Sequence, residues 1–182
     1  MMIIRMSLSL LCTTFELIMK LKILFLLLFI LCGGMMHGQS LKQDFDKPGF
    51  YEVLASGKLS DIDKELDLLN TESIPEKEAY EGTLLMRKSG LLKIPAEKLR
   101  FFKRGRIKLE SALLKDSSNC EYHFLRLTIQ EHAPKVVKYN AELENDKQYI
   151  LKNFKDLSPV VQKVIIDYSK NSKILNPEDF NS

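Results

Sequence analysis

Tryptophan is absent from the sequence, and glycine and proline are scarce. The 182 residues contain no Trp, 8 Gly and 6 Pro. A sandwich of β-strands needs frequent turns, and such turns draw on glycine and proline. The composition therefore argues against a β-sandwich, including the carbohydrate-binding kind.

Cysteine is also rare. Cys12 and Cys32 lie in the first 38 residues, so the rest of the chain has only Cys120. A single thiol excludes an intramolecular disulfide there. The remaining residues must be held together by their apolar core, and they are numerous enough to form one.

Charge of one sign does not dominate. Lys and Arg number 27 and Asp and Glu number 24, and the first 38 residues hold three of the basic residues and one of the acidic residues. Proteins that bind nucleic acids carry a basic stripe that neutralises phosphates, whereas Lys and Glu alternate here. We therefore expect no nucleic-acid partner. The 45% hydrophobic and 28% charged residues are typical of one globular domain.

The longest apolar run lies near the amino terminus. From Met19 the order is two lysines (Lys20 and Lys22), an unbroken apolar run over residues 23–32, and a region of small residues that ends at Gly38. This order of basic, apolar and small residues is that of a signal peptide. The run is too short to cross a hydrocarbon core of ~30 Å at a rise of ~1.5 Å per residue.

We therefore expect residues 1–38 to be a leader that is cleaved near Gly38. Residues 39–182 would then form one exported domain in the periplasm or outside the cell. The residues before Met19 include a second apolar stretch and Glu16, which a misassigned start codon would explain. The alternative is a membrane-associated protein that retains its hydrophobic segment uncleaved.

Apolar residues at helical spacing characterise the rest of the chain. No stretch alternates with a period of two for long enough to require a sheet, so the expected fold class is all-α. The expected helices are Pro48 to Leu54, a segment after Ser60 that includes Ile62 and Leu69, Pro75 to Ser89, Pro95 to Leu113, Tyr122 to Ala133, Ala141 to Phe154, and Ser158 to Tyr168.

Several of these helices have recognisable ends. Pro48 and Gly57 bracket the first helix, and Ser60 is a suitable N-cap for the second. Gly90 is expected to end the third helix. Residues 171–182 at the end of the chain are expected to be loosely held.

The fourth expected helix has the clearest apolar stripe. Its residues Leu99, Phe102, Arg106, Leu109 and Leu113 follow one another in steps of three and four. Arg106 stands inside this stripe. It would pair with a buried carboxylate or a ligand anion, or extend to the edge of the stripe.

One segment of the chain resembles a tetratricopeptide repeat. In residues 105–119, which read GRIKLESALLKDSSN, Gly105 and Ala112 stand where the repeat prefers small residues, and Leu109 stands where it has a large one. Residues 121–130 then resemble the first helix of a following repeat. The resemblance covers about one and a half repeats.

The chain departs from the repeat at Ser117, where proline is usual, and in the long stretch 90–104. The resemblance implies antiparallel helical hairpins, arranged as a tetratricopeptide-like (TPR-like) small bundle or short solenoid. It also implies a concave face that binds a protein or a peptide. We expect an apolar or aromatic groove that stays partly open, and the candidate partner-binding residues are Tyr80, Phe102, Arg106, Tyr122 and Phe124.

Cys120 and His123 are the candidates for chemistry. They are three residues apart at the start of an expected helix, so their side chains share one face, and the helix amino terminus would lower the pKa of the thiol. His132 lies about 180° away around the helix and cannot join them as a third metal ligand. A small hydrolase that uses the pair is the alternative to a buried, unreactive cysteine.

Motifs of other enzyme classes are missing. The sequence has no glycine-rich phosphate loop, no nucleophile elbow and no HExxH or CxxCH motif. We therefore expect a non-catalytic protein without cofactor or metal. The basic run from Arg100 to Lys108, which includes Phe101 and Phe102, would contact an anionic lipid surface or an acidic partner, or is a solvated helix face.

Overall fold

The structure is a computed structural model in which residues 45–180 are described, together with Lys22. The chain divides into two units, Met1–Gln43 and Asp44–Ser182, and the description that follows concerns the second. The expected leader, residues 1–38, lies outside the described residues apart from Lys22. Within the described residues, no helix has the length and apolar character that a membrane crossing requires.

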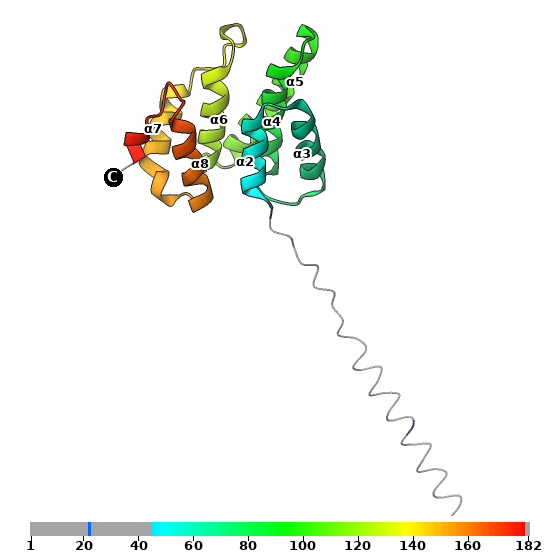
Figure 1. The fold of residues 1–182 in the computed structure, drawn as a ribbon, viewed down its shortest axis with the longest axis horizontal. Coiled ribbons are helices and arrows are strands. Elements are labelled where there is room, and N and C mark those ends of the chain that lie inside the picture. The colour runs from blue at the N-terminus through cyan, green and yellow to red at the C-terminus, as the bar shows by residue number, and fades with distance from the viewer. Residues whose placement is uncertain (1–21, 23–44, 181–182) are drawn as a thin grey trace, which may run out of the picture. The chain divides into compact units, whose positions relative to one another are not determined.

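Helices build the second unit, and its described residues contain no strand. The prediction of an all-α fold is confirmed. The helices are α2 (Lys47–Ser56), α3 (Leu59–Thr71), α4 (Lys77–Leu91), α5 (Pro95–Lys115), α6 (Cys120–His132), α7 (Leu143–Asn153) and α8 (Pro159–Ser169), with short 3-10 turns η1 (Lys135–Val137), η2 (Phe154–Asp156) and η3 (Pro177–Phe180) (Figure 1).

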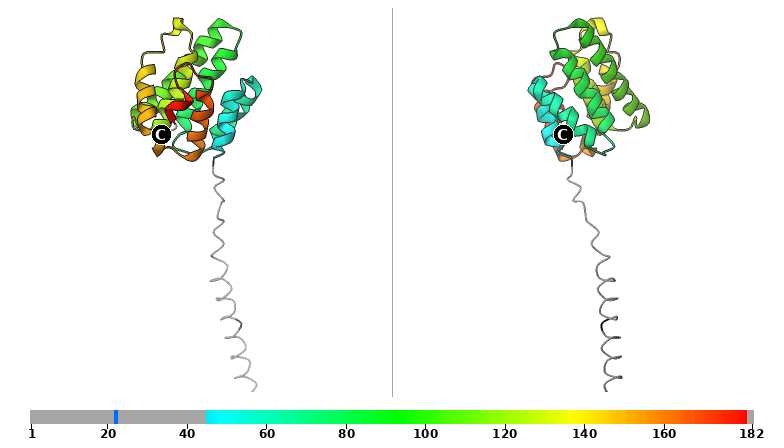
Figure 2. Two further views of the ribbon diagram at one scale, coloured as in Figure 1. Left: turned by 60° about the vertical axis from the view of Figure 1, so that its left-hand side comes forward. Right: turned by 90° about the vertical axis from the view of Figure 1, so that its right-hand side faces the viewer.

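Successive helices run in opposite directions (Figures 1 and 2). The most extensive contacts join α4 to α5 and α6 to α7. Because α4 and α6 run in the same direction, the connection from α4 to α5 and the connection from α6 to α7 lie at the same end of this unit. This arrangement is that of antiparallel helical hairpins packed side by side.

The backbones of α4 and α5 are in contact at two glycines. A Cβ atom added to Gly82 would lie 2.7 Å from the amide nitrogen of Leu109, and one added to Gly105 would lie 2.5 Å from the carbonyl oxygen of Gly82. Real Cβ atoms do not approach other atoms so closely, so both positions require glycine at this helix spacing. The glycines therefore explain why this pair of helices has the most extensive contact in the unit.

Aromatic rings connect the even-numbered helices through the core. Phe50 of α2 stacks on Tyr80 of α4 with ring centroids 4.2 Å apart, and Tyr51 of α2 lies 6.3 Å from Phe124 of α6. Phe124 in turn meets Tyr168 of α8 edge to face at 5.5 Å. Such rings contribute ~1.5–3 kcal/mol each when they are fully buried, and they fix the positions of α2, α4, α6 and α8 around a common centre.

Some of the predicted helix ends are wrong, and α4 begins at Lys77 instead of Pro75. Gly57 adopts a left-handed conformation (φ 65°) and ends α2 as predicted. However, α3 begins at Leu59, before Ser60, and the Ser60 hydroxyl bonds to Asp61 instead of capping the helix. Gly90 lies inside α4, which continues to Leu91 because the Leu91 side chain packs against the core.

The carboxyl-terminal segment is held more firmly than the sequence predicts. Leu175 is completely buried in the core. The Glu131 carboxylate on α6 accepts hydrogen bonds from the Tyr168 hydroxyl (2.6 Å), the Ser172 hydroxyl (2.8 Å) and the Lys173 amide (2.6 Å). One acidic side chain and one buried leucine therefore fasten this segment to the helices.

Candidate functional site

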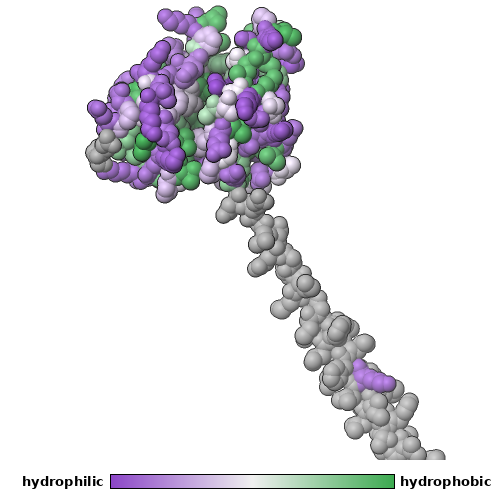
Figure 3. Space-filling model, viewed as in Figure 1, coloured by the Kyte–Doolittle hydropathy of each residue, from purple (hydrophilic) through white to green (hydrophobic). Residues whose placement is uncertain are grey.

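A groove opens between α2, α4, α6 and α8, with a volume of about 790 Å³. Figure 3 looks onto the face of the molecule where the groove lies, and hydrophobic side chains are visible along it. Aliphatic and aromatic side chains from all four helices form its walls and floor. They include Leu54, Met86, Phe124, Ile129, Val160 and Val164.

The wall formed by α8 shows how the sequence produces this groove. Val160, Val164 and Tyr168 recur every four residues and line the groove, whereas Val161 and Ile165 are buried on the adjoining face of the helix. The helix is therefore apolar over two faces instead of one. One face fills the core, and the other is left at the groove.

Charges of both signs lie at the groove. Lys163 and Asp167 on α8 form an exposed ion pair at 2.7 Å, and Glu52 on α2 is also exposed. The Nε atom of Arg87 donates to the backbone oxygen of Leu54 at 3.2 Å, and in the described residues Arg87 makes no ion pair. The groove therefore has an apolar interior and a rim on which positive and negative side chains are mixed.

The predicted aromatic residues occupy two different places. Phe102 and Phe124 line the groove, but they are buried, with exposed fractions of 7% and 1%. Tyr80 and Tyr122 do not line it, and with exposed fractions of 0% and 4% they belong to the core. The expectation that these four aromatic side chains stay partly open is wrong. The two tyrosines can be buried because their hydroxyls find acceptors inside: Glu121 for Tyr80 (2.6 Å) and the Pro75 carbonyl for Tyr122 (3.4 Å).

Arg106 extends away from the apolar stripe of α5. Its side chain is exposed, and its guanidinium lies 4.9 Å from the ring centroid of Tyr139. It makes no ion pair with a described carboxylate, so the predicted pairing with a buried acid is not found. The stripe itself is continued by Phe102, Leu109 and Leu113, which are buried.

Buried Glu121 fixes the position of Tyr51, a tyrosine that lines the groove. Glu121, at the start of α6, accepts hydrogen bonds from the hydroxyls of Tyr51 (2.8 Å) and Tyr80 (2.6 Å) and from the ammonium of Lys47 (2.8 Å). Burial and the negative charge of Glu121 raise the pKa of both tyrosines. Their hydroxyls therefore stay protonated, and the Tyr51 ring is held at the groove by its own hydroxyl.

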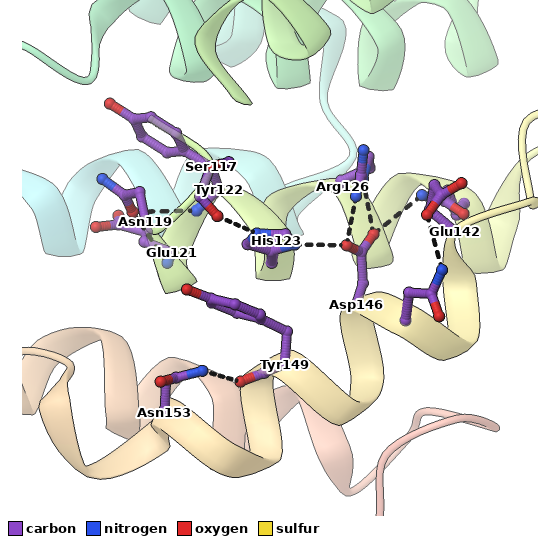
Figure 4. Close-up of polar contacts among 12 residues, drawn as sticks. Ser117, Asn119, Glu121, Tyr122, His123, Arg126, Glu142, Asp146, Tyr149 and Asn153 are labelled. Atoms are coloured by element: carbon purple, nitrogen blue, oxygen red, sulfur yellow. Dashed lines mark hydrogen bonds and ion pairs between the residues drawn. The ribbon is translucent and has the colours of Figure 1, made fainter. Parts of the chain in front are cut away.

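A second buried carboxylate joins α6 to α7 (Figure 4). Asp146 of α7 is completely buried and accepts two hydrogen bonds from Arg126 (2.8 and 2.7 Å) and one from the Gln130 amide (3.1 Å). His123 Nδ1 lies 2.7 Å from the same carboxylate. Asp146 thus meets four polar atoms of one helix face, as a buried charge requires.

Both ring nitrogens of His123 face hydrogen-bond acceptors. Nδ1 faces Asp146, and Nε2 lies 2.9 Å from the backbone oxygen of Ser117. The ring is therefore fixed through both nitrogens, to α7 on one side and to the turn before α6 on the other. The ring also stacks on Tyr149 of α7 at 4.1 Å.

Cys120 is buried, and its thiol pKa is not lowered as its place at a helix amino terminus had suggested. Burial, with a contribution from the carboxylates of Asp156 and Glu121, raises the pKa of the Cys120 thiol to about 12. The helix amino terminus does not overcome this effect. A thiol with such a pKa is not a nucleophile at neutral pH, and His123 is engaged by Asp146 and Ser117 instead.

Sequence reasoning missed the buried carboxylates of Glu121 and Asp146 and the groove wall on α8. A usable signal for Asp146 was present in α6, because His123, Arg126 and Gln130 follow one another at helical spacing. Three polar donors on one buried face require an acceptor on a neighbouring element. Nothing in the sequence indicated which of the many carboxylates would supply it.

The fold and the groove together define a class, which is that of all-α proteins with an open apolar groove between antiparallel helices. Comparison with protein-family models, with curated proteins and with solved structures gives no match for this chain. The residues that line the groove therefore carry the functional argument.

Proposed function

We propose that this chain is an exported, non-catalytic helical protein that binds a peptide segment of a partner protein in the groove between α2, α4, α6 and α8. The single observation that carries this proposal is the open groove itself, to which four helices contribute apolar side chains. Apolar surface left accessible in a concavity of this size marks a binding site.

The walls and the rim specify the ligand. A volume of about 790 Å³ accommodates a few apolar side chains but no large domain. Because Glu52, Arg87 and the pair Lys163–Asp167 bring both signs of charge to the groove, the ligand we propose is a peptide with several apolar side chains and little net charge. The TPR-like resemblance supports the same kind of partner, a peptide bound by a concave helical face.

The groove can be tested with peptides selected from a random display library on residues 44–182. This fragment is a compact unit whose described core draws on its own residues, and circular dichroism would verify its folding. We expect selected apolar peptides to bind the Val164→Glu variant at least about tenfold more weakly, because a carboxylate would be desolvated in the groove.

The matched control is Leu114→Glu on α5, which introduces the same charge at an 86% exposed position outside the groove. It should leave peptide affinity unchanged. Selected peptides that bind the Val164→Glu variant as well as the original fragment would refute the groove as their site.

Export is tested at the amino terminus of the protein isolated from its native cells. We propose cleavage near Gly38, so mass spectrometry should find a terminus close to Gln39. An intact hydrophobic segment that begins at Met1 or Met19 would instead establish the alternative, a membrane-associated protein that retains its leader.

A further inference from the structure

A second surface lies at the end of the helical unit where α4 turns into α5 and α6 turns into α7. We define the basic tip as residues 93–104 and 134–139. Both segments lie at the same end of the unit in every view (Figures 1 and 2). Tyr139 links them, since its ring meets Phe102 edge to face at 5.6 Å and the Arg106 guanidinium at 4.9 Å.

Charge is concentrated at the basic tip. Its two segments contain seven Lys and Arg residues and one carboxylate, that of Glu97, although the whole chain has a formal charge of only +3. Glu97 is satisfied by Arg100 at 3.6 Å. The basic tip is therefore a positively charged surface on a protein whose net charge is small.

An aromatic ring gathers part of this charge. The ring centroid of Phe101 lies 4.6 Å from Lys88 Nζ, 5.1 Å from Arg100 Cζ and 5.6 Å from Arg104 Cζ. Lys88 belongs to α4 outside the basic tip and is ion-paired with Asp63. Of the tip's own cations, the ring face therefore brings together Arg100 and Arg104 and offsets their mutual repulsion.

Exposed aliphatic side chains stand among these cations. Ile94 is 56% exposed, Leu99 48% and Val136 86%, and each directly follows a lysine in the sequence. Lys138, at the end of η1, adopts a left-handed backbone (φ 47°), and this turn closes the loop that presents Val136. Exposed apolar side chains beside lysines are typical of proteins that insert side chains among lipid headgroups.

We propose that the basic tip docks on the surface of an anionic phospholipid bilayer. The cations would lie at the phosphate level, and Ile94, Leu99 and Val136 would reach the acyl boundary. An acidic protein fits this surface less well, because the aliphatic side chains at the tip protrude and form no concave site. The groove of the proposed function is lined by other residues, apart from Phe102 and Pro134.

Vesicle co-sedimentation of residues 44–182 tests this proposal. The fragment should bind vesicles of phosphatidylcholine mixed with phosphatidylglycerol, should not bind vesicles of phosphatidylcholine alone, and should be released by salt. The double variant Lys93→Glu/Lys98→Glu should bind the mixed vesicles at least about tenfold more weakly. The matched control is Lys152→Glu/Lys155→Glu, with two exposed lysines at the opposite end of the unit, and it should retain binding.

The apolar contribution has its own matched pair. Val136 and Leu114 are both 86% exposed, but only Val136 belongs to the basic tip. Val136→Asp should weaken vesicle binding, and Leu114→Asp should not. Equal weakening by both charge pairs or by both aspartates, or binding to a polyacidic protein but not to vesicles, would overturn the proposal. The Val164→Glu groove variant should bind vesicles normally, so failure of one proposal is distinguishable from failure of the other.

Discussion

The hairpins α4–α5 and α6–α7 differ sharply from the pair α2 and α8. The two hairpins are locked, one by the glycine contact of Gly82 with Gly105 and the other by the buried carboxylate of Asp146. In contrast, α2 and α8 barely touch, and an open groove separates their apolar faces. The close contacts that stabilise this fold therefore lie in the two hairpins, whereas α2 and α8 keep apolar surface uncovered at the groove.

Removing the buried carboxylate should have the largest effect on stability. Asp146→Ala removes the buried acceptor of Arg126 and His123. Arg126 is left with the partly exposed Glu110, and His123 with the Ser117 carbonyl. Breaking a buried charge network from one side costs about 3–5 kcal/mol, so we expect a loss of that order in the free energy of unfolding measured in urea. The control Asp167→Ala removes an exposed pair on α8 and should leave the unfolding midpoint unchanged.

The glycine contact should be nearly as sensitive. Gly105→Ala places a Cβ atom 2.5 Å from the Gly82 carbonyl oxygen and 2.8 Å from the Met86 amide nitrogen, both of them backbone atoms. We expect the free energy of unfolding to fall by about 1–3 kcal/mol, because the two helices must move apart. Gly90→Ala is the matched control: its Cβ atom would meet nothing within 4 Å, and α4 should gain about 0.5–1 kcal/mol. A neutral Gly105→Ala variant would mean that the close contact is not required.

The open side should tolerate what the locked side does not. Ala55→Leu on α2 adds a larger side chain at an exposed position that lines the groove. The free energy of unfolding, measured by thermal denaturation, should change by no more than about 0.5 kcal/mol, as for other surface substitutions. Peptide affinity should nevertheless fall, because the new side chain occupies ligand space. A large loss of stability would show that α2 and α8 are packed as tightly as the hairpins.

The smallest expected effect is a local response to acid. Burial alone would raise the pKa of Glu131, but the hydrogen bonds from the Lys173 amide and from the Tyr168 and Ser172 hydroxyls outweigh it and lower the pKa. A lowered folded-state pKa contributes stability that is present above the ordinary glutamate pKa of about 4.3 and is lost as the pH falls through the folded-state value. The protection factor of the Lys173 amide, which is its intrinsic exchange rate at each pH divided by the observed rate, should therefore fall in acid. The Glu131→Gln variant should abolish this pH dependence.

Helical periodicity was sufficient to predict the elements of this fold. The stripe of Phe102, Leu109 and Leu113 and the caps at Pro48 and Gly57 are local features that need no knowledge of distant residues. The prediction failed where tertiary contact decides, as at Gly90, where the packing of Leu91 continues the helix. At such positions, tertiary packing decides where a helix ends, and the local sequence does not.

The groove could not be predicted in the same way. Its walls are α2 and α8, which are separated by most of the described chain, and no periodicity shows which apolar face will remain uncovered. The sequence proposed Phe102, Phe124 and Tyr80 alike as groove residues. It could not show that only the two phenylalanines line the groove, because the Tyr80 hydroxyl bonds to a glutamate from another helix. Burial of a polar aromatic residue depends on a partner that its own segment does not contain.

The position of α2 and α8 has a mechanical consequence. These are the first and last α-helices of the described unit, and they meet each other through few contacts. Tension applied through the two ends of the chain would therefore separate α2 from α8 before it separated α4 from α5. A peptide bound to both α2 and α8 would oppose this separation, and it should raise the force needed for the first extension step in a single-molecule pulling experiment.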